Sequence, residues 1–332
     1  MDDSFQTIDP NVWLREQQLD GYEAGAFDWT TSDDSNAYAS TNGLVIMPTL
    51  TNLTTDITPL QIINGYRLNL TSTGACTSQQ VTSCAVHSNL TMGTIINPVR
   101  SARLTTRLSK SIKYGRVEVV AKLPKGDWLL PSIKLFPVNE TYGEWPRSGS
   151  VDIMFSRGNE ARYRAGGRNF FISAVHWGVS QVTDRFRWTS AGRPIRRSDY
   201  TQEFNTFGLE WTEDYIVAYH NRRTFSVMKT SFVKDSLWDR GRFPNNGSLE
   251  ANPWARSKNQ NAPFDQAFYL SLSVQVGATR RSDGSDKPWV DSSPRPASDF
   301  WAAVSDWYPT WGDGEERAMT VRNVKMWQQG KC

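Results

Sequence analysis

Short runs of alternating polarity recur along the whole chain and constrain its fold more than any other feature of the sequence. Successive side chains of a β-strand point to opposite faces, so such alternation is typical of strands with one buried face. Each run ends at Gly, Pro, Asn or Asp, which suits the turns between antiparallel strands. The runs occupy residues 43–50, 114–123, 150–155, 169–178, 205–223, 268–277 and 318–328.

Helical spacing of apolar residues is confined to two short segments. Residues 233–243 are compatible with a short helix, and residues 297–308 with a second helix or an irregular segment. Residues 240–262 are polar and rich in Pro, Asn and Gly, which predicts a surface loop. Since no repeat or low-complexity linker divides the chain, we predict an all-β protein with one sandwich domain over residues 1–332.

The composition argues against several classes of function. A chain of 332 residues, 38% of them hydrophobic, can bury a large core without metals or many disulfides. The formal net charge is only +3 and no nucleic-acid-binding signature is present, so no nucleic acid partner is expected. No run of about eighteen apolar residues exists, so no transmembrane segment is expected. The first residues carry no secretory signal. They look like either a start introduced for expression or the trimmed end of a mature protein.

Two features nevertheless predict passage through the secretory pathway. Cys76 and Cys84 close a short loop without His or acid at ligand spacing, which favours a disulfide over a metal site and leaves Cys332 as the odd cysteine. Asn-x-Ser/Thr sequons for N-glycosylation add a weaker indication, because a chain rich in these residues contains some by chance. The sequons are at Asn52, Asn69, Asn89, Asn139 and Asn246. We expect a glycoprotein that is secreted, cell-wall-associated or lumenal.

Fourteen tryptophans are present, and several lie in turn-like or strand-end settings. Packing explains most tryptophans, because the ring usually dominates a core. An exposed ring can instead stack on the C–H face of a sugar, and a groove of such rings with polar rims suits an extended, uncharged glycan. Their number and placement together favour carbohydrate binding. The residues in these settings are Trp128, Trp145, Trp177, Trp289 and Trp311.

Several separately spaced motifs occur in a characteristic order: SARLTTRLSKSIKYGRVEVVAKLPKGDWLLP, YGEWPRSGSVDIMFSRGN, HWG, FNTFGLEWTEDYIVAY, PFDQAFYLSLSVQVG, KPWVDSSP and VRNVKMW. On these motifs, the chain from about Asp28 to Gln328 resembles glycoside hydrolase family 16, in particular its laminarinase-like endo-β-1,3-glucanases and the related invertebrate β-1,3-glucan recognition proteins. The resemblance implies a concanavalin A-like β-jelly-roll sandwich of two curved antiparallel sheets, with the glycan in the concave cleft. The strand pattern agrees with this fold.

The family's active-site strand resembles Gly-Glu-Ile-Asp-Ile-Met-Glu, in which the first Glu is the nucleophile and the last is the general acid/base. A retaining glycosidase needs these carboxyl groups about 5–5.5 Å apart. Residues two apart on a strand share a face, whereas residues five apart share it only if a bulge resets the register. By resemblance, Ser150 is at the nucleophile position, Asp152 at the central carboxylate and Phe155 at the acid/base position. Both working carboxylates are therefore absent.

Other cleft positions also depart from the family pattern. Lys134 in PSIKLF stands where relatives have Trp, and Ser273 in LSLSVQVGA stands where many have Asn. Arg280 and the arginine after it favour a modified or anionic glycan, or form a solvated charge pair. His176 in HWG resembles a cleft histidine but is also compatible with a structural role, as is Asp152. The expected substrate-binding residues are Trp145, His176, Lys134, Trp289, Trp311, Ser273 and Arg280.

The sequence thus supports the hypothesis of a catalytically inactive domain that binds β-1,3-glucan, with or without β-1,6 branches, in an aromatic cleft. Its partner would be a β-glucan polysaccharide or oligosaccharide. One alternative is a weak or altered glucanase or transglycosylase that uses Asp152. Another is a structural cell-wall or interaction protein without a functional cleft. No cofactor is required, although many family members hold a calcium ion on the convex side, largely through backbone oxygens.

Overall fold

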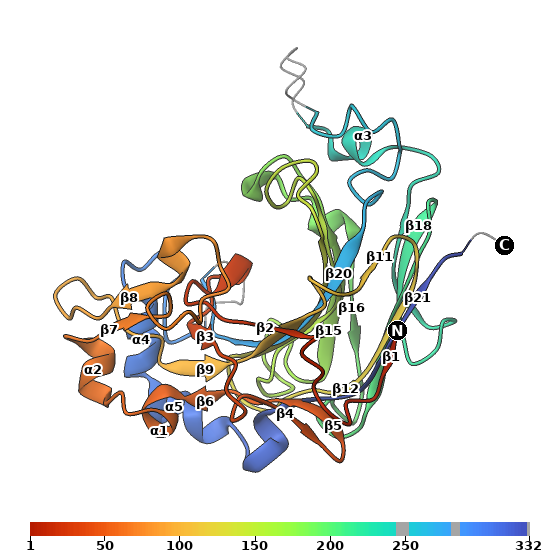
Figure 1. Cartoon of the computed structure of the whole chain (residues 1–332). Coiled ribbons are helices and arrows are strands. Elements are labelled where there is room, and N and C mark those ends of the chain that lie inside the picture. Colours follow the sequence, from red (N-terminus) through yellow and green to blue (C-terminus); the bar gives the residue numbers. More distant parts are fainter. Residues whose placement is uncertain (244–251, 280–285, 331–332) are drawn as a thin grey trace.

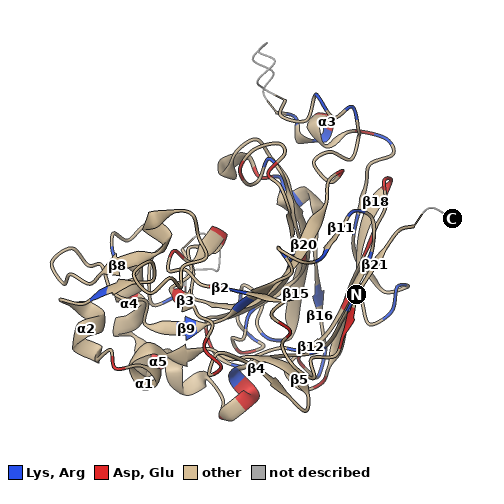
Figure 2. Cartoon of the chain, viewed as in Figure 1, with Lys and Arg blue, Asp and Glu red and all other residues tan. Residues whose placement is uncertain are grey.

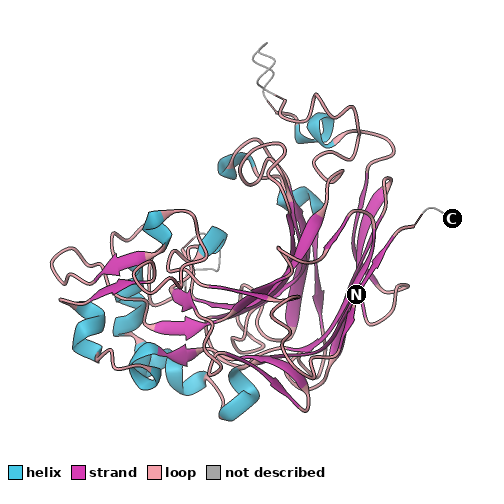
Figure 3. Ribbon diagram, in the orientation of Figure 1, coloured by secondary structure: helices cyan, strands magenta, loops and turns pink. Residues whose placement is uncertain are grey.

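The computed structural model describes residues 1–243, 252–279 and 286–330. Within these residues, two curved eight-stranded antiparallel sheets form the body of the molecule, as Figures 1 and 3 show. The first sheet has the order β19 (Ser226–Ser231), β18 (Tyr215–His220), β17 (Asn205–Trp211), β12 (Gly115–Lys122), β21 (Met319–Gln328), β5 (Gly43–Ile46) and β4 (Ala37–Ser40), with β1 (Asp2–Asp3) paired to β21. The predicted jelly-roll sandwich is confirmed.

The second sheet carries the strand that resembles the family's active-site strand. Its order is β16 (Ser190–Pro194), β15 (Phe170–His176), β14 (Ser150–Ser156), β13 (Leu129–Pro137), β20 (Phe268–Val276), β10 (Arg103–Thr105) and β2 (Leu14–Glu16), with β11 (Ser111–Ile112) paired to β20. Every run of alternating polarity in the sequence contains a strand of one of these sheets. The strand predictions are therefore confirmed.

The facing sides of the two sheets enclose the main apolar core. On β12, the inward residues Val117 and Val119 are buried while their neighbours are half-exposed, which is the alternation of a strand with one covered face. Strand β20 differs, because all nine of its residues are buried, including Ser271 and Ser273 on the side opposite the core. Burying a Val or Leu side chain contributes about 1.5–3 kcal/mol, so these inward rows provide much of the stability. The burial of the opposite face of β20 shows that another segment covers it.

Smaller elements form an end lobe beside the sandwich (Figures 1 and 3). In the lobe, β3 (Asp28–Thr30) pairs in parallel with β9 (Val99–Ser101), which also pairs with β6 (Thr49–Leu50), and β7 (Arg67–Asn69) pairs with β8 (Ala85–His87). Its α-helices are α1 (Thr51–Thr54), α2 (Pro59–Ile63), α4 (Pro296–Ala302) and α5 (Val304–Trp307). Helix α3 (Leu237–Gly241) lies away from this lobe (Figure 1), and it confirms the first predicted helix, as α4 and α5 confirm the second.

Single 3₁₀ turns complete the fold: η1 (Tyr22–Ala24), η2 (Val81–Ser83), η3 (Gln181–Thr183), η4 (Phe186–Thr189), η5 (Tyr308–Thr310) and η6 (Gly314–Arg317). Lys and Arg are interspersed with Asp and Glu along the ribbon (Figure 2), in keeping with the small net charge. In the described parts of the chain, no helix has the length and apolar character needed to cross a membrane.

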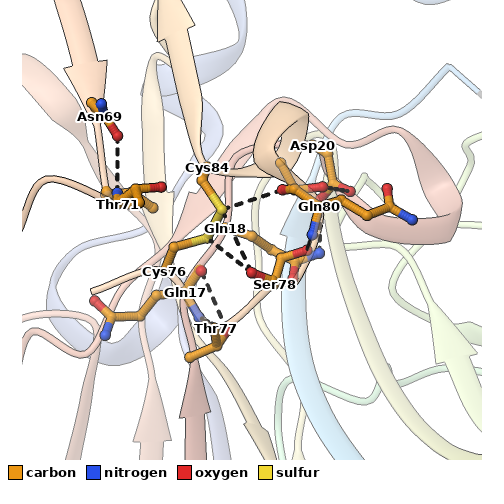
Figure 4. The surroundings of a disulfide bond; sticks show 12 residues. Gln17, Gln18, Asp20, Asn69, Thr71, Cys76, Thr77, Ser78, Gln80 and Cys84 are labelled. Carbon is orange, nitrogen blue, oxygen red and sulfur yellow. Dashed lines mark hydrogen bonds between the residues drawn. A yellow bond between two sulfur atoms is a disulfide. The ribbon is translucent and has the colours of Figure 1, made fainter. Parts of the chain in front are cut away.

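The predicted disulfide is confirmed in the end lobe. Cys76 and Cys84 are bonded, with their Cα atoms 5.6 Å apart (Figure 4). The loop between them is held to the N-terminal segment, because the Gln17 backbone N–H donates to Thr77 Oγ1 at 2.8 Å. The disulfide thus fixes a loop that also anchors the segment leading from β2 into η1. Cys332 lies outside the described residues.

The sequons differ in accessibility. Asn139 is exposed in the turn after β13, whereas Asn52, Asn69 and Asn89 are half-buried. The side-chain oxygen of Asn69 accepts a hydrogen bond from the Thr71 backbone N–H at 2.9 Å (Figure 4). Asn246 lies outside the described residues. Glycosylation stays a prediction, and Asn139 offers the most open of the described acceptors.

Candidate functional site

Strand β14 contains the bulge that the spacing of the family motif requires. On the β13 side, Lys134 pairs with Asp152 and Ile133 pairs with Met154, so one residue of β14 is extra at this point. Ile153 and Met154 both pack into the core between the sheets. The register therefore resets after Asp152, and positions 150, 152 and 155 face the same side, away from that core.

This side of the sheet opens into a cleft of about 760 Å³ over β14 and β15. All three motif positions line it, together with predicted residues Lys134, Trp145 and His176. The further lining residues are Glu23, Ala24, Arg157, Ile172, Ala174, Gln181, Val182, Asp184, Phe186 and Arg187. The cleft thus combines aromatic, apolar and charged side chains, the mixture typical of a small-molecule or glycan site.

The hydroxyl of Ser150 is held by an aromatic neighbour. The indole Nε1–H of Trp145 donates to Ser150 Oγ at 3.0 Å, and indole is a donor only. His176 lies directly across from Ser150 on β15, but its ring nitrogens face the carboxylates of Asp152 and Asp184. Neither neighbour can therefore take the hydroxyl proton, and within the described residues no hydrogen bond joins Ser150 to the base that an activated serine needs.

His176 is held between two carboxylates. Its Nδ1 lies 2.7 Å from Asp184 Oδ2, and its Nε2 lies 3.4 Å from Asp152 Oδ2. Burial alone would lower its pKa, but the charges and hydrogen bonds of the two aspartates raise the pKa of His176 to about 9. The ring is therefore a cation at neutral pH. This histidine positions charge in the cleft and cannot serve there as a neutral base.

A second cation links the strand to a distant loop. Lys134 Nζ lies 3.3 Å from Asp152 Oδ1 and 2.9 Å from Oε1 of Glu23, which belongs to η1. The other oxygen of Glu23 lies 3.3 Å from Arg103 of β10. Burial opposes ionisation, but Lys134 and Arg103 hold the pKa of Glu23 well below its usual range. Glu23 is thus a fixed carboxylate that cannot act as a general acid at neutral pH.

The acid/base position lines the cleft but is packed against apolar groups. Phe155 packs in a small buried cluster with Ala24, Leu130 and Ala278. The guanidinium carbon of Arg157 lies 5.1 Å from the centre of its ring, and Arg157 also donates to the Ala165 carbonyl at 3.0 Å. A phenyl ring in this setting carries no exchangeable proton, so it offers a surface for contact rather than for proton transfer.

Aromatic rings form the opposite wall of the cleft. Trp145 is half-buried, and its ring centre lies 5.8 Å from that of His176. Phe186 of η4 stacks on His176, with ring centres 5.0 Å apart and an interplanar angle of 21°. All three rings line the cleft and are only half-buried, so they give it an aromatic surface that is partly open to solvent. Such a surface suits the C–H face of a sugar ring.

Two predicted stacking residues need correction. Trp289 and Trp311 are only 3% and 2% exposed and belong to the main core, so no sugar can stack on them. The indole of Trp289 donates to the Ala278 carbonyl and packs against Phe27 and Phe300. The indole of Trp311 donates to the Asp127 carbonyl. Packing is therefore the role of both rings.

One further predicted contact, Ser273, does not line the open cleft. Ser273 faces the same side of the sheet as Asp152, but it is buried and shares a hydrogen bond of 2.9 Å with Ser132. It is thus not accessible to a ligand in this structure. Arg280 lies outside the described residues. In the described parts of the chain, no group of three or more His, Cys, Asp or Glu side chains is placed to hold a metal ion, and the calcium expectation, which rests on backbone oxygens, stays a prediction.

Sequence reasoning missed several residues of the site. Glu23 gave no local signal, because its partner Lys134 is 111 positions away. Asp184 and Phe186 lie among the short 3₁₀ turns after β15, where no periodicity marks them. Arg157 could have been predicted from the sequence, since it lies two residues after Phe155 and so keeps the alternating spacing of the active-site strand.

No family model matches the chain. A β-1,3-glucan-binding protein of Penaeus monodon is 35% identical over an aligned length of 343 positions, and the alignment covers 98% of this chain and 89% of that protein. Gram-negative bacteria-binding protein 1 of Drosophila melanogaster is 26% identical and covers 93% of this chain, but the match spans only 61% of its own length. This chain therefore spans less than two thirds of the longer insect relative.

Solved structures support the fold independently. The laminarinase catalytic domain of Thermotoga maritima superposes with a TM-score of 0.58 at 19% identity, covering all of this chain and 98% of that one. A mutant of a family 16 non-specific endo-β-1,3(4)-glucanase, crystallised with 1,3-β-D-cellotriosyl-glucose, superposes with a TM-score of 0.58 at 19% identity. The superposition covers 99% of this chain and 93% of the glucanase chain. At this identity, the likeness establishes a shared fold.

Proposed function

This chain belongs to the β-1,3-glucan-binding protein family, on a glycoside hydrolase family 16 fold, and we propose that it binds β-1,3-glucan in the cleft over β14 and β15 without hydrolysing it. The observation that carries the proposal is the bulge in β14. It still presents Ser150, Asp152 and Phe155 to one cleft, but only one of the three is a carboxylate. The shape of a glycan site is thus retained while its reactive pair is gone.

Contacts to sugar are provided by the walls of the cleft. The partly open rings of Trp145 and Phe186, each in contact with the cationic His176, offer surfaces for the C–H face of a glucose unit. The carboxylates of Asp152 and Asp184 can accept hydrogen bonds from sugar hydroxyls beside these rings. We therefore assign Trp145 as the main stacking residue, with Asp152 and Lys134 as polar groups of the floor.

Hydrolysis requires two groups that exchange protons or attack the anomeric carbon. Ser150 has no base among its described neighbours, Phe155 has no proton to give, and Glu23 is held ionised. General acid–base catalysis contributes about 10²–10⁴-fold, and loss of the nucleophile removes the covalent route as well. The alternative of a weak enzyme based on Asp152 meets the same difficulty, because Asp152 lies between the cations Lys134 and His176.

The proposal is tested by calorimetric titration with laminari-oligosaccharides, followed by chromatography of the same mixture after long incubation. Binding with intact sugars is the expected result. Shortened or rearranged sugars would support the altered enzyme, and an Asp152→Asn variant would then show whether that carboxylate is responsible. Absence of any binding, with the fold intact by circular dichroism, would favour a structural protein without a functional cleft.

The remaining expectations accompany this function. The Cys76–Cys84 disulfide indicates an extracellular, secreted protein, and we propose association with a glucan-containing wall as its finer location. We also propose that residues 1–332 act as one domain, since the main core draws on residues from Phe5 to Met326. Glucan binding through stacking and hydrogen bonds needs no cofactor.

A further inference from the structure

The cleft stops partway across the second sheet. Two rows of side chains run across its strands on the cleft side, as the strand registers define. From β15 to β2, one row is Ile172, Phe155, Ser132, Ser273, Arg103 and Glu16, and the other is Ala174, Asp152, Lys134, Ser271, Thr105 and Leu14. Only the members on β15, β14 and the Lys134 position of β13 line the cleft.

The rest of each row is covered. Ser132, Ser271 and Ser273 are buried although they face the cleft side of the sheet, and Thr105 of β10 is fully buried. Part of this cover is supplied by residues 21–26, which we call the wall loop. Its Glu23 pairs with both Lys134 of β13 and Arg103 of β10, the strands on either side of β20. Glu23 and Ala24 also line the cleft where the open part of the rows ends.

The wall loop is fixed at both ends by β20 and the chain after it. The Gln275 side-chain amide donates to the Gly21 carbonyl at 3.1 Å, and the Thr279 backbone N–H donates to the Gly25 carbonyl at 3.2 Å. In the middle, Glu23 pairs with Lys134 and Arg103, and Ala24 packs on Phe155. The loop is thus joined to the sheet by hydrogen bonds, ion pairs and apolar contact together.

The backbone of the wall loop is also specifically shaped. Gly21 has φ 67° and Gly25 has φ 60°, the left-handed region that glycine adopts at low cost. A Cβ at Gly21 would lie 2.2 Å from the Ala26 backbone nitrogen, so only glycine fits there. The turn therefore has a defined conformation, and its contacts hold it across the path that a glycan would follow over β13 and β20.

We propose that the wall loop makes the cleft blind on its β13 side, so that the protein recognises the end of a β-1,3-glucan chain rather than an internal stretch. This inference rests on the proposed glucan binding and adds which part of the polymer is bound. A glucan chain that lies along the rows, starting over β15, meets Glu23 and Ala24 after it passes Lys134. One terminal sugar of the glucan must therefore lie at the Lys134 end of the cleft. The other end of the chain leaves the cleft over β15.

The test uses the intact protein and three forms of one long laminari-oligosaccharide: unmodified, blocked at the reducing end by a bulky dye, and blocked at the non-reducing end by a bulky ether. Affinity is measured by calorimetry, with a Trp145→Ala variant to show that binding takes place in the cleft. We expect one singly blocked sugar to lose at least about tenfold in affinity and the other to stay within about twofold of the unmodified sugar.

Each other outcome overturns the inference in a distinguishable way. Undiminished binding of both blocked sugars would mean a cleft open at both ends and would leave glucan binding intact. Loss of both would mean a pocket closed at both ends. Failure of the unmodified sugar to bind would remove the proposed function itself, and the end recognition with it. Undiminished affinity in the Trp145→Ala variant would place binding elsewhere on the molecule and would also reject the blind cleft.

Discussion

Trp145 donates its indole N–H to the hydroxyl of Ser150 at 3.0 Å, so the residue at the nucleophile position serves to orient a ring of the cleft wall. In a hydrolase, the residue at this position would attack the sugar. Here, Ser150 at the same position holds the ring on which we expect a sugar to stack. This exchange of roles explains how a cleft can persist after its reactive pair is lost. It also makes Trp145 the first residue to test.

Replacing Trp145 by alanine should weaken glucan binding by about 2 kcal/mol, roughly 30-fold in affinity, because the main stacking surface is removed. Calorimetric titration measures the change. Trp188→Ala is the matched control, since Trp188 is 52% exposed but does not line the cleft, and it should leave affinity unchanged. Equal affinity of the two variants would argue against the cleft as the binding site.

Phe155→Glu, which returns a carboxyl group to the acid/base position, should lower the free energy of unfolding by about 3 kcal/mol or more. The new group would be buried against Ala24, Leu130 and Ala278, where an ionised carboxylate loses its water. Phe155→Leu, which keeps the site apolar, should cost no more than about 1.5 kcal/mol. Urea unfolding measures both. Similar stability of the two variants would show that water or the neighbouring Arg157 guanidinium compensates the new carboxylate.

The titration of Glu23 should make the free energy of unfolding depend on pH in the acid range. Its pKa is lowered in the folded protein, so its stabilising effect is complete above the unfolded value near 4.5 and is lost as pH falls below that value. The Glu23→Gln variant lacks this titration, so its free energy of unfolding should fall less steeply from neutral to acid pH. Urea unfolding across this range measures the difference. Parallel pH profiles would mean that Glu23 is not held by Lys134 and Arg103.

The titration of His176 should change stability in the opposite direction, so that stability is lost as pH rises rather than as it falls. Its folded pKa of about 9 is raised above the usual 6.5, so its contribution is complete below pH 6.5 and is lost as pH rises towards 9. Nuclear magnetic resonance of the imidazole protons measures the pKa directly. His220 provides an internal comparison, because burial and the nearby Arg193 lower its pKa to about 4. A midpoint near 6.5 for His176 would contradict its placement between two carboxylates.

Local sequence features predicted part of each sheet, and the resemblance to the family motif predicted the shape of β14. Alternation identified β5, β12, β17, β18 and β21 in one sheet and β14, β15 and β20 in the other, but it missed shorter strands and β13. The spacing of Ser150, Asp152 and Phe155 in the family motif required the bulge that β14 contains. The wall loop was beyond such reasoning, because its effect depends on contacts between η1 and strands more than a hundred residues away. Trp289 was misassigned for a similar reason, since a turn-like sequence around a tryptophan does not reveal that Phe27 and Phe300 enclose it.

Charged groups of alternating sign lie in succession beneath and beside the cleft. In order of contact, they are Asp184, His176, Asp152, Lys134, Glu23, Arg103 and Glu16. Replacing one interior member alone leaves a buried neighbour partly uncompensated, at a cost of several kcal/mol. We therefore expect substitutions of these charged residues to occur as compensatory pairs. Positions scattered from residue 16 to residue 184 would then be inherited as one unit, and among homologues they should vary together rather than singly.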